Sequence, residues 1–278
     1  MKKKSIITKS RVLAIILALV LALGMAACGS KDEPATPKED EESSLSGEVM
    51  IAAAASLENA FVEELIPMFN ETYPDVKITG TYDASGKLQT QIEEGLPAAI
   101  FFSAANKQMT ALKDGGFIDE GTITNLLENE VVLITGTNTD TKVTSFDNIT
   151  DAATIAIGDP ASVPAGQYAE EALTSLGSWA DVEKKASLGT NVTEVLNWVA
   201  EGSAEVGIVY KTDAASMADK VKILGVAPEG SLKTPVIYPI AMTSNLDDTQ
   251  KELAEAFLEF LKSNDALAVF EKYGFKAA

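Results

Sequence analysis

Short apolar stretches alternate with helix-like patterns from residue 48 onward, and this alternation constrains the fold more than any other feature. Residues 48–55, 76–82 and 98–102 are rich in apolar and β-branched side chains, which is typical of buried strands. Between them, residues 57–69 and 85–95 place apolar side chains at helical spacing on one face. An alternation of strand and helix predicts an α/β layer with a mainly parallel sheet.

A second series of the same kind follows, with predicted strands at residues 130–135, 154–157, 206–210 and 221–226. The chain then crosses back, and a last helical stretch ends near Phe275. We therefore expect an α/β fold with two lobes, each a mainly parallel sheet flanked by helices, and a cleft between them. The predicted boundaries are 47–128 plus 234–278 for lobe 1, and 129–233 for lobe 2.

The N-terminus has the pattern of a bacterial lipoprotein signal peptide, which we assign to residues 1–27. A basic start is followed by an apolar run that is short for a membrane span. The run ends in Met25-Ala26-Ala27-Cys28-Gly29, which resembles a lipobox, and Cys28 is the predicted lipidation site. The alternative is an uncleaved N-terminal anchor with a chance cysteine.

Residues 28–46 are predicted to be a lipidated cysteine and a disordered acidic tether. This segment is almost free of apolar side chains and cannot bury enough surface to fold. A lipid anchor followed by a tether places the folded part at the extracytoplasmic face of the cell membrane. The chain has one cysteine, so an internal disulfide is impossible.

The composition excludes several classes of function. The 278 residues include no histidine, 41 acidic and 22 basic side chains, and the formal net charge is −19. Without histidine, the Ser-His-Asp and Cys-His mechanisms and histidine-containing zinc sites are impossible. The acidic balance argues against nucleic acid as a partner, because phosphate contacts require lysine and arginine. We therefore expect no histidine-dependent catalysis, no histidine-containing metal site and no nucleic-acid partner.

A rigid turn between a predicted strand and a predicted helix, residues 158–168, is the first candidate site. Its prolines and glycines restrict the backbone, and Pro164 suits the first turn of a helix. The N–H groups of Ala165 and Gly166 are then expected to be free at the positive end of the helix dipole, where an anion binds well. The alternative is a tight connection without a ligand.

Five residues are predicted to face the cleft. Four of them are expected at helix N-termini, and Ser56 is expected to be an N-cap residue. Serine hydroxyls, backbone N–H groups and a phenol are all hydrogen-bond donors, so we expect a cage of donors with no carboxylate. Such a cage suits a fully deprotonated tetrahedral oxyanion. The five residues are Ser56, Ser85, Ala165, Val192 and Tyr210.

Four motifs together resemble the molybdate-binding proteins of ABC importers. The resemblance extends from about residue 47 to residue 276, and it is specific because the motifs occur in the family's order. The chain departs from the family at Ala99 and Ala105, where aspartate is usual, and at Gly86 and Lys87. The motifs are Ala53-Ala54-Ala55-Ser56-Leu57, Gly158-Asp159-Pro160 with Val163-Pro164-Ala165-Gly166, Gly207-Ile208-Val209-Tyr210, and Lys272-Tyr273-Gly274-Phe275.

The resemblance implies expectations about the fold, the ligand and the partners. It implies a two-lobed periplasmic-binding-protein-like fold of type II, with molybdate or tungstate held by neutral hydrogen bonds in the cleft. The metal of the oxyanion is then contacted only through its oxygens, by the five residues named above. The implied protein is a monomer, is not an enzyme, needs no cofactor and delivers its ligand to an ABC permease.

Two alternatives remain open at this stage. The same donors fit sulfate, another oxyanion or a small carboxylate. An extracellular hydrolase is also conceivable, with Ser56 or Ser85 as nucleophile and Lys87 or Lys211 as base. A lysine base must be desolvated to lose its proton near neutral pH, and both lysines have polar neighbours in the sequence.

Overall fold

The computed structural model describes residues 45–278. The signal peptide predicted at residues 1–27, the lipidation site at Cys28 and nearly all of the tether predicted at residues 28–46 lie outside the described residues. Within the described part of the chain, no helix is both long enough and apolar enough to cross a bilayer.

The first of two sheets is built around strand β1 (Gly47–Ala54), whose side chains are buried from Ile51 onward. β1 pairs in parallel with β2 (Val76–Asp83) and β3 (Ile100–Phe102), so their carboxyl ends meet at one edge. The strand order is β11-β4-β10-β3-β1-β2. The remaining strands are β4 (Thr124–Asn129), β10 (Val236–Met242) and β11 (Lys276–Ala277).

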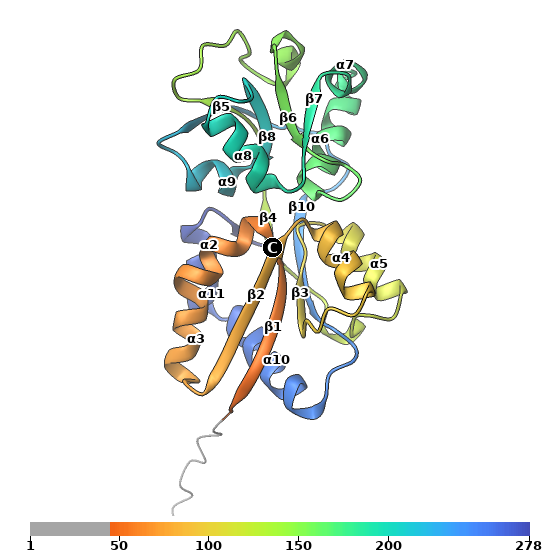
Figure 1. Cartoon of the computed structure of the whole chain (residues 1–278), viewed down its shortest axis with the longest axis vertical. Coiled ribbons are helices and arrows are strands. Elements are labelled where there is room, and N and C mark those ends of the chain that lie inside the picture. Colours follow the sequence, from red (N-terminus) through yellow and green to blue (C-terminus); the bar gives the residue numbers. More distant parts are fainter. Residues whose placement is uncertain (1–44) are drawn as a thin grey trace, which may run out of the picture. The chain divides into compact units, whose positions relative to one another are not determined.

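The second sheet has the strand order β7-β6-β8-β5-β9 and lies above the first in the view of Figure 1. The three inner strands, β6, β8 and β5, are fully buried, which agrees with their nearly continuous apolar sequences. The strands are β5 (Val131–Gly136), β6 (Ile155–Gly158), β7 (Ala186–Gly189), β8 (Val206–Tyr210) and β9 (Val221–Val226).

Helices cover both sheets, with α4 and α10 on β1 of the first sheet and α6 and α8 on β6 of the second (Figure 1). The helices of the first sheet are α2 (Glu58–Ala60), α3 (Ile66–Thr72), α4 (Ser85–Glu93), α5 (Asn106–Asp114), α10 (Asp248–Leu261) and α11 (Asn264–Lys272). Those of the second are α6 (Pro164–Ser175), α7 (Trp179–Glu183), α8 (Val192–Ala200) and α9 (Lys211–Ser216). Short 3-10 turns span Ala55–Leu57, Glu120–Thr122 and Phe146–Asp151, and Phe61–Leu65 is a π-helical turn.

The predicted α/β class with two sheets is confirmed, but both sheets are mixed rather than mainly parallel. β10 is antiparallel to β3 and β4, and β5 is antiparallel to β8 and β9. Within one sheet, a helix that crosses between two neighbouring strands brings the chain back to run in the same direction, so those strands are parallel. A strand that follows a crossing from the other sheet has no such connection, and it can pair in either direction. The strands that break the parallel pattern are therefore those nearest the two crossings.

The chain changes sheet twice. Asn129 ends β4 in the first sheet, and Val131 begins β5 in the second. The return lies between Val226 at the end of β9 and Val236 at the start of β10. Residues 44–278 nevertheless form one compact unit by their contacts. The lobe limits at residues 128 and 233 therefore stay a prediction.

An aromatic cluster joins the C-terminal helices to the first sheet. The ring of Phe61 lies 6.1 Å from that of Phe102 on β3 and 5.9 Å from that of Phe270 on α11. Phe257 of α10 packs edge-on against Phe69 at 4.8 Å. Burying each such ring contributes about 1.5–3 kcal/mol. The predicted return of the last helices to the first sheet is confirmed by these contacts and by the pairing of β11 with β4.

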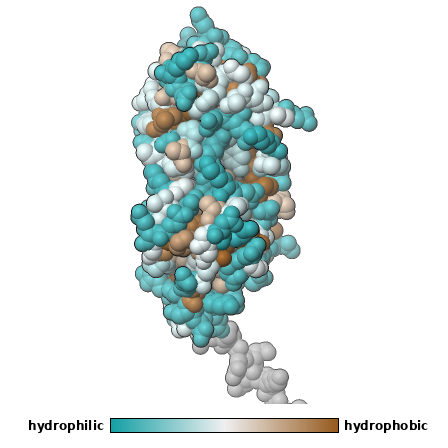
Figure 2. Space-filling model, turned by 90° about the vertical axis from the view of Figure 1, so that its right-hand side faces the viewer, coloured by the Kyte–Doolittle hydropathy of each residue, from teal (hydrophilic) through white to brown (hydrophobic). Residues whose placement is uncertain are grey.

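The face of the molecule in Figure 2 is largely hydrophilic, with small apolar patches scattered across it. The largest exposed apolar side chains are Val62, Leu188, Ile223 and Val226. Three of them lie on β7 and β9, the two edge strands of the second sheet. The acidic composition predicts such a surface, because most of the charged side chains must remain in water.

Candidate functional site

A small cavity lies where the carboxyl ends of β1 and β2 meet the amino ends of helices α6 and α8. All five residues predicted from the sequence line it. Its volume is about 10 Å³, room for about one water molecule. The lining residues are Ala54, Ala55, Ser56, Asp83, Ala84, Ser85, Ala104, Val163, Pro164, Ala165, Val192 and Tyr210.

Ser85 is the first residue of α4, as predicted, and it is completely buried. Its Oγ accepts a hydrogen bond from the backbone N–H of Ala104 over 3.0 Å. Because the oxygen is already used as an acceptor, the hydroxyl proton is available for a group inside the cavity. The backbone N–H of a first helical residue also has no partner within the helix.

The prediction that Ser56 caps a helix is wrong. Ser56 lies inside the 3-10 turn Ala55–Leu57, and the residue before that turn, Ala54, makes no side-chain capping bond. The Oγ of Ser56 instead lies 2.9 Å from the Oη of Tyr238 on β10. The strand ends at Ala54, one residue earlier than expected, and the 3-10 turn begins at Ala55, so Ser56 lies inside that turn and not before it. Ser56 thus reaches the cavity by its hydroxyl and not through a capping role.

The turn before α6 holds Ala165 as expected, with Pro164 as the first helical residue. The expectation that Gly166 also offers a free N–H is wrong, because this group donates to the carbonyl oxygen of Val163 over 2.9 Å. A Cβ on Gly166 would stand only 2.0 Å from the carbonyl oxygen of Gly158. The glycine is therefore needed for close packing, and Ala165 alone remains to donate.

Val192 is the first residue of α8, and its N–H has no partner within that helix. Asn191 caps the helix, since its side chain accepts from the N–H of Glu194 over 2.9 Å. The Glu194 carboxylate in turn accepts from the N–H of Thr190 over 2.6 Å. These two hydrogen bonds join the first turn of α8 to the two residues before the helix.

Tyr210 ends β8 and is 1% exposed. Its Oη is buried and has no hydrogen-bond partner among residues 45–278. Burial raises the pKa of Tyr210 well above its ordinary value, with the neighbouring Tyr238 adding to the shift, so the phenol keeps its proton. A buried hydroxyl without a partner costs free energy, and such a group inside a cavity indicates a ligand.

The prediction of a cavity without a carboxylate is wrong, because Asp83 lines it. Its Oδ1 accepts from the N–H of Ala84 over 2.8 Å and from the side-chain amide of Asn191 over 3.2 Å. Lys87 pairs with the same carboxylate at 3.3 Å, which offsets its charge. The position was overlooked because Asp83 is the last residue of a strand, two residues before a predicted site residue.

A second carboxylate, that of Asp213, lies behind Tyr210 and was also missed. It is 6% exposed, and its Oδ2 accepts from the backbone N–H of Tyr210 over 3.0 Å. Burial raises the pKa of Asp213 to about 7, while the bond from Tyr210 acts in the opposite direction. The sequence signal was the spacing of three residues after a strand end, which is typical of a helix start.

The third carboxylate near the site, that of Asp159, is used within its own turn. Its Oδ1 accepts from the N–H of Ala161 over 2.9 Å, a bond typical of aspartate in an Asx turn. Among the described residues, no group of three or more His, Cys, Asp or Glu side chains is arranged to hold a metal ion. The hydroxyl and backbone N–H groups that line the cavity are donors suited to the oxygens of an anion.

Neither lysine of the hydrolase alternative is placed as a base. Lys87 is paired with Asp83, and Lys211 is paired with Glu130. The Lys211 side chain is 47% exposed and lies in contact with water. A charged lysine in an ion pair cannot take a proton from a serine.

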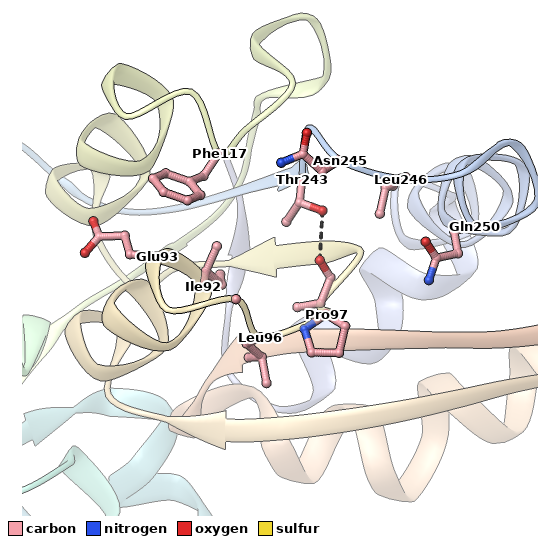
Figure 3. A pocket seen from close by; sticks show the side chains of 11 residues that line it. Ile92, Glu93, Leu96, Pro97, Phe117, Thr243, Asn245, Leu246 and Gln250 are labelled. Atoms are coloured by element: carbon pink, nitrogen blue, oxygen red, sulfur yellow. Dashed lines mark hydrogen bonds between the residues drawn. The ribbon is translucent and has the colours of Figure 1, made fainter.

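A larger cavity of about 320 Å³ lies in the first-sheet half, away from all five predicted site residues (Figure 3). Its side chains come from the loop after α4, the segment after β10 and the start of α10. Thr243 donates to the carbonyl oxygen of Ala98 over 2.8 Å, so this hydroxyl of the cavity lining already has a hydrogen-bond partner. The Ser56–Tyr210 cavity therefore remains the candidate site.

Several known proteins are similar to this chain in sequence and in fold. The family model of bacterial extracellular solute-binding proteins matches residues 49–276. The candidate ABC transporter substrate-binding lipoprotein YvgL of Bacillus subtilis is 38% identical over 262 residues, which is 94% of this chain and 96% of that protein. The molybdate-binding protein ModA of Haemophilus influenzae is 36% identical over 239 residues, which is 84% of this chain and 91% of ModA.

A solved structure agrees with these matches. The periplasmic molybdate-binding protein of Azotobacter vinelandii superposes with a TM-score of 0.69 at 23% identity, covering 82% of this chain and 98% of that protein. At this identity the match supports the two-lobed fold alone. The family assignment rests on the sequence relatives and on the family model. Members of this family are solute-binding proteins and not enzymes, as the sequence predicted. The chain belongs to the bacterial extracellular solute-binding proteins of ABC transporters and is a ModA-like member of that family.

Proposed function

We propose that this protein captures molybdate, and also tungstate, in the Ser56–Tyr210 cavity and delivers the oxyanion to an ABC permease. The proposal adds a ligand, a site and a delivery step to the family assignment. It is supported by the ModA relatives and by the donors that line the cavity. The ligand is cargo and not a cofactor.

The observation that carries the proposal is the unpaired hydroxyl of Tyr210. This Oη is buried in a wall that also contains Ser56, Ser85, Ala165 and Val192. An oxyanion oxygen would satisfy the hydroxyl and remove the cost of burying it unpaired. The phenol can only donate to an acceptor without a proton, and the dianion MoO₄²⁻ presents such oxygens.

The energy of binding would come from many neutral donors and not from a buried cation. Each hydrogen bond to a charged group contributes about 1.5–3 kcal/mol. Three hydroxyls and the N–H groups at the starts of α4, α6 and α8 can contribute such bonds. Burying a dianion is costly unless most of its oxygens are paired, so the donors must act together.

The size of the cavity implies movement on binding. At about 10 Å³ it is smaller than an anion with four oxygens requires. Its walls come from both sheets, which are joined by crossings near Glu130 and before Val236. We infer that the lobes move apart to admit the ligand and close on it afterward, as in the hinge closure of other two-lobed binding proteins.

The anchoring of the protein is a separate part of the proposal. We infer that Cys28 carries a lipid and holds a monomer at the extracytoplasmic face of the membrane. The support is the basic and apolar signal pattern before Cys28 and the polar tether after it. A Cys28→Ala variant should then leave the membrane fraction and appear in the medium. Retention of residues 1–27 in the mass of the wild-type protein would instead support an uncleaved anchor.

Thermal shift and calorimetry with four oxyanions test the ligand assignment. We expect molybdate and tungstate to raise the melting temperature at concentrations where sulfate and phosphate have little effect. A ligand at one hundred times its Kd stabilises by about 2.7 kcal/mol, which is readily measured. Ser56→Ala should weaken molybdate binding by about 1–3 kcal/mol. Tight binding of sulfate with none of molybdate would overturn the assignment.

A further inference from the structure

A buried chain of hydrogen bonds leads from the end of β4 to Ser56, and its direction can be deduced. It begins at Asn129, whose Oδ1 accepts from the backbone N–H of Glu130 over 2.8 Å. A backbone N–H can only donate, so this bond establishes which end of the amide is the oxygen. The Nδ2 of Asn129 therefore donates at its other contacts, to Thr212 Oγ1 over 2.9 Å and to Tyr238 Oη over 3.2 Å.

The next member of the chain is Tyr238 on β10, which is 0% exposed. Its Oη has two partners among the described residues, Asn129 Nδ2 and Ser56 Oγ. Because the Asn129 amide donates, the single proton of Tyr238 has Ser56 Oγ as its acceptor, over 2.9 Å. Burial raises the pKa of Tyr238 well above its ordinary value, so this proton is present at any working pH.

The last member is Ser56, which lines the cavity. When its Oγ accepts from Tyr238, its own proton is free to point at a ligand. If the bond ran in the other direction, Ser56 would present only lone pairs to an oxyanion and would repel it. We propose that Tyr238 and Asn129 are positioning residues that hold the Ser56 hydroxyl as a donor for the oxyanion.

The inference rests on the proposed function, since it assumes a ligand that accepts hydrogen bonds. It goes beyond that function by assigning a role to two residues outside the cavity lining. Asn129 also contacts Thr212 of α9, which directly follows β8 of the second sheet. The orientation of Ser56 is therefore linked to the place where the chain crosses between the sheets.

A double-mutant cycle separates positioning from general structural support. Molybdate binding is measured by calorimetry on purified wild-type protein, Tyr238→Phe, Ser56→Ala and the double variant. We expect Tyr238→Phe to weaken binding about 3- to 30-fold in the wild-type background. In the Ser56→Ala background, where there is no hydroxyl to orient, we expect a change of less than about 2-fold. The ring contact of Tyr238 with Tyr210, 5.6 Å between centroids, is retained in the Phe variant.

A second variant reverses the chain of bonds. Asn129→Asp keeps the shape but replaces the donor with an acceptor, so Tyr238 would donate to residue 129 and Ser56 would donate to Tyr238. We expect Asn129→Asp to weaken molybdate binding more than Tyr238→Phe does. In the Ser56→Ala background, most of this difference between the two variants should disappear. Asn125→Asp is the matched control, because exposed Asn125 lies on the same strand and gains the same charge.

The outcomes distinguish the two proposals. If the wild-type protein binds molybdate but Tyr238→Phe weakens it equally in both backgrounds, the positioning role is wrong and the proposed function stands. If Asn129→Asp behaves like Asn125→Asp, the deduced direction of the bonds is wrong. If the wild-type protein binds none of molybdate, tungstate, sulfate and phosphate, both proposals fail. Melting temperatures of all variants show whether each is folded. If one variant does not fold, Tyr238→Phe still tests the positioning role by itself, and Asn129→Asp still tests the direction of the bonds.

Discussion

Gly86 donates its backbone N–H to the carbonyl oxygen of Ser162 over 2.9 Å, which joins the start of α4 to the turn before α6. The first residue belongs to the first-sheet half and the second to the second-sheet half. A Cβ on Gly86 would stand 2.5 Å from that oxygen and 2.8 Å from the Cα of Ser162. The two backbones can therefore approach this closely only because residue 86 is glycine.

Gly86→Ala should weaken molybdate binding by about 1–3 kcal/mol, because the added methyl group prevents the approach that closes the cavity. Alanine favours the helix by about 1 kcal/mol relative to glycine, so the melting temperature without ligand should not fall. Calorimetry and thermal unfolding measure the two effects. Gly225→Ala is the control, since its added Cβ would have its nearest neighbour at 3.8 Å. Unchanged affinity in Gly86→Ala would show that this contact is unimportant for closure.

Tyr210→Phe should separate binding from stability. Removal of the hydroxyl takes away a donor to the ligand, and we expect binding to weaken by about 1–3 kcal/mol. The same hydroxyl is buried without a partner, so its removal should leave the free energy of unfolding unchanged or slightly higher. Calorimetry with molybdate and urea unfolding without it provide the two values. A clear loss of stability would mean that the hydroxyl has a partner within the protein.

Gly166→Ala should disrupt the turn that presents Ala165. Its Cβ would stand 2.0 Å from the carbonyl oxygen of Gly158 and 2.5 Å from the carbon of the same group, so the backbone must shift. We expect a loss of about 1–3 kcal/mol in the free energy of unfolding, with weaker oxyanion binding. Urea unfolding measures the first effect. Gly121→Ala, whose nearest neighbour would be a side-chain oxygen at 3.4 Å, should change stability far less.

Asp213 should make the protein less stable as the pH rises from about 4 to about 7. Burial raises its pKa from 3.8 to about 7, so in this range the folded protein holds a proton that the unfolded chain has lost. The folded state binds more protons, and its stability must fall with increasing pH, by as much as about 4 kcal/mol from this group.

Asp213→Asn removes this titration and can still accept the bond from Tyr210. The difference in unfolding free energy between the variant and the wild type should therefore grow between pH 5 and pH 8, in favour of the variant. Urea unfolding across this range measures it. Comparing the variant with the wild type cancels the pH dependence that other groups contribute to stability. One such group is Glu130, whose pKa is lowered mainly by its bond from Lys211 and whose contribution has the opposite sign. A constant difference would show that Asp213 ionises at its ordinary pKa.

Several local features were predictable because they depend on short stretches of chain. The start of α8 follows from its capping residue Asn191, and the start of α6 follows from Pro164. The start of α4 follows from the apolar spacing after Ser85. Strand β4 and the short β11 were missed, since each is stabilised by pairing with strands distant in the sequence. Local patterns contain no information about such partners.

The carboxylates show the same limit within the site. Asp83 reaches the cavity because its strand ends beside α8, where Asn191 of the other half donates to it. Asp213 is 6% exposed in the folded protein, and that burial raises its pKa. Neither environment can be deduced from neighbours in the chain, because desolvation depends on the complete fold.

By itself, the sequence determined the alternation of strands and helices, the absence of histidine chemistry and the five residues now found around one cavity. These depend on residue type and local spacing. Only the tertiary structure decided the direction of β5 and β10, the partner of Ser56 and the unpaired state of the Tyr210 hydroxyl. Each of these depends on atoms brought together from segments many residues apart, and their free energy arises only when the chain has folded around them.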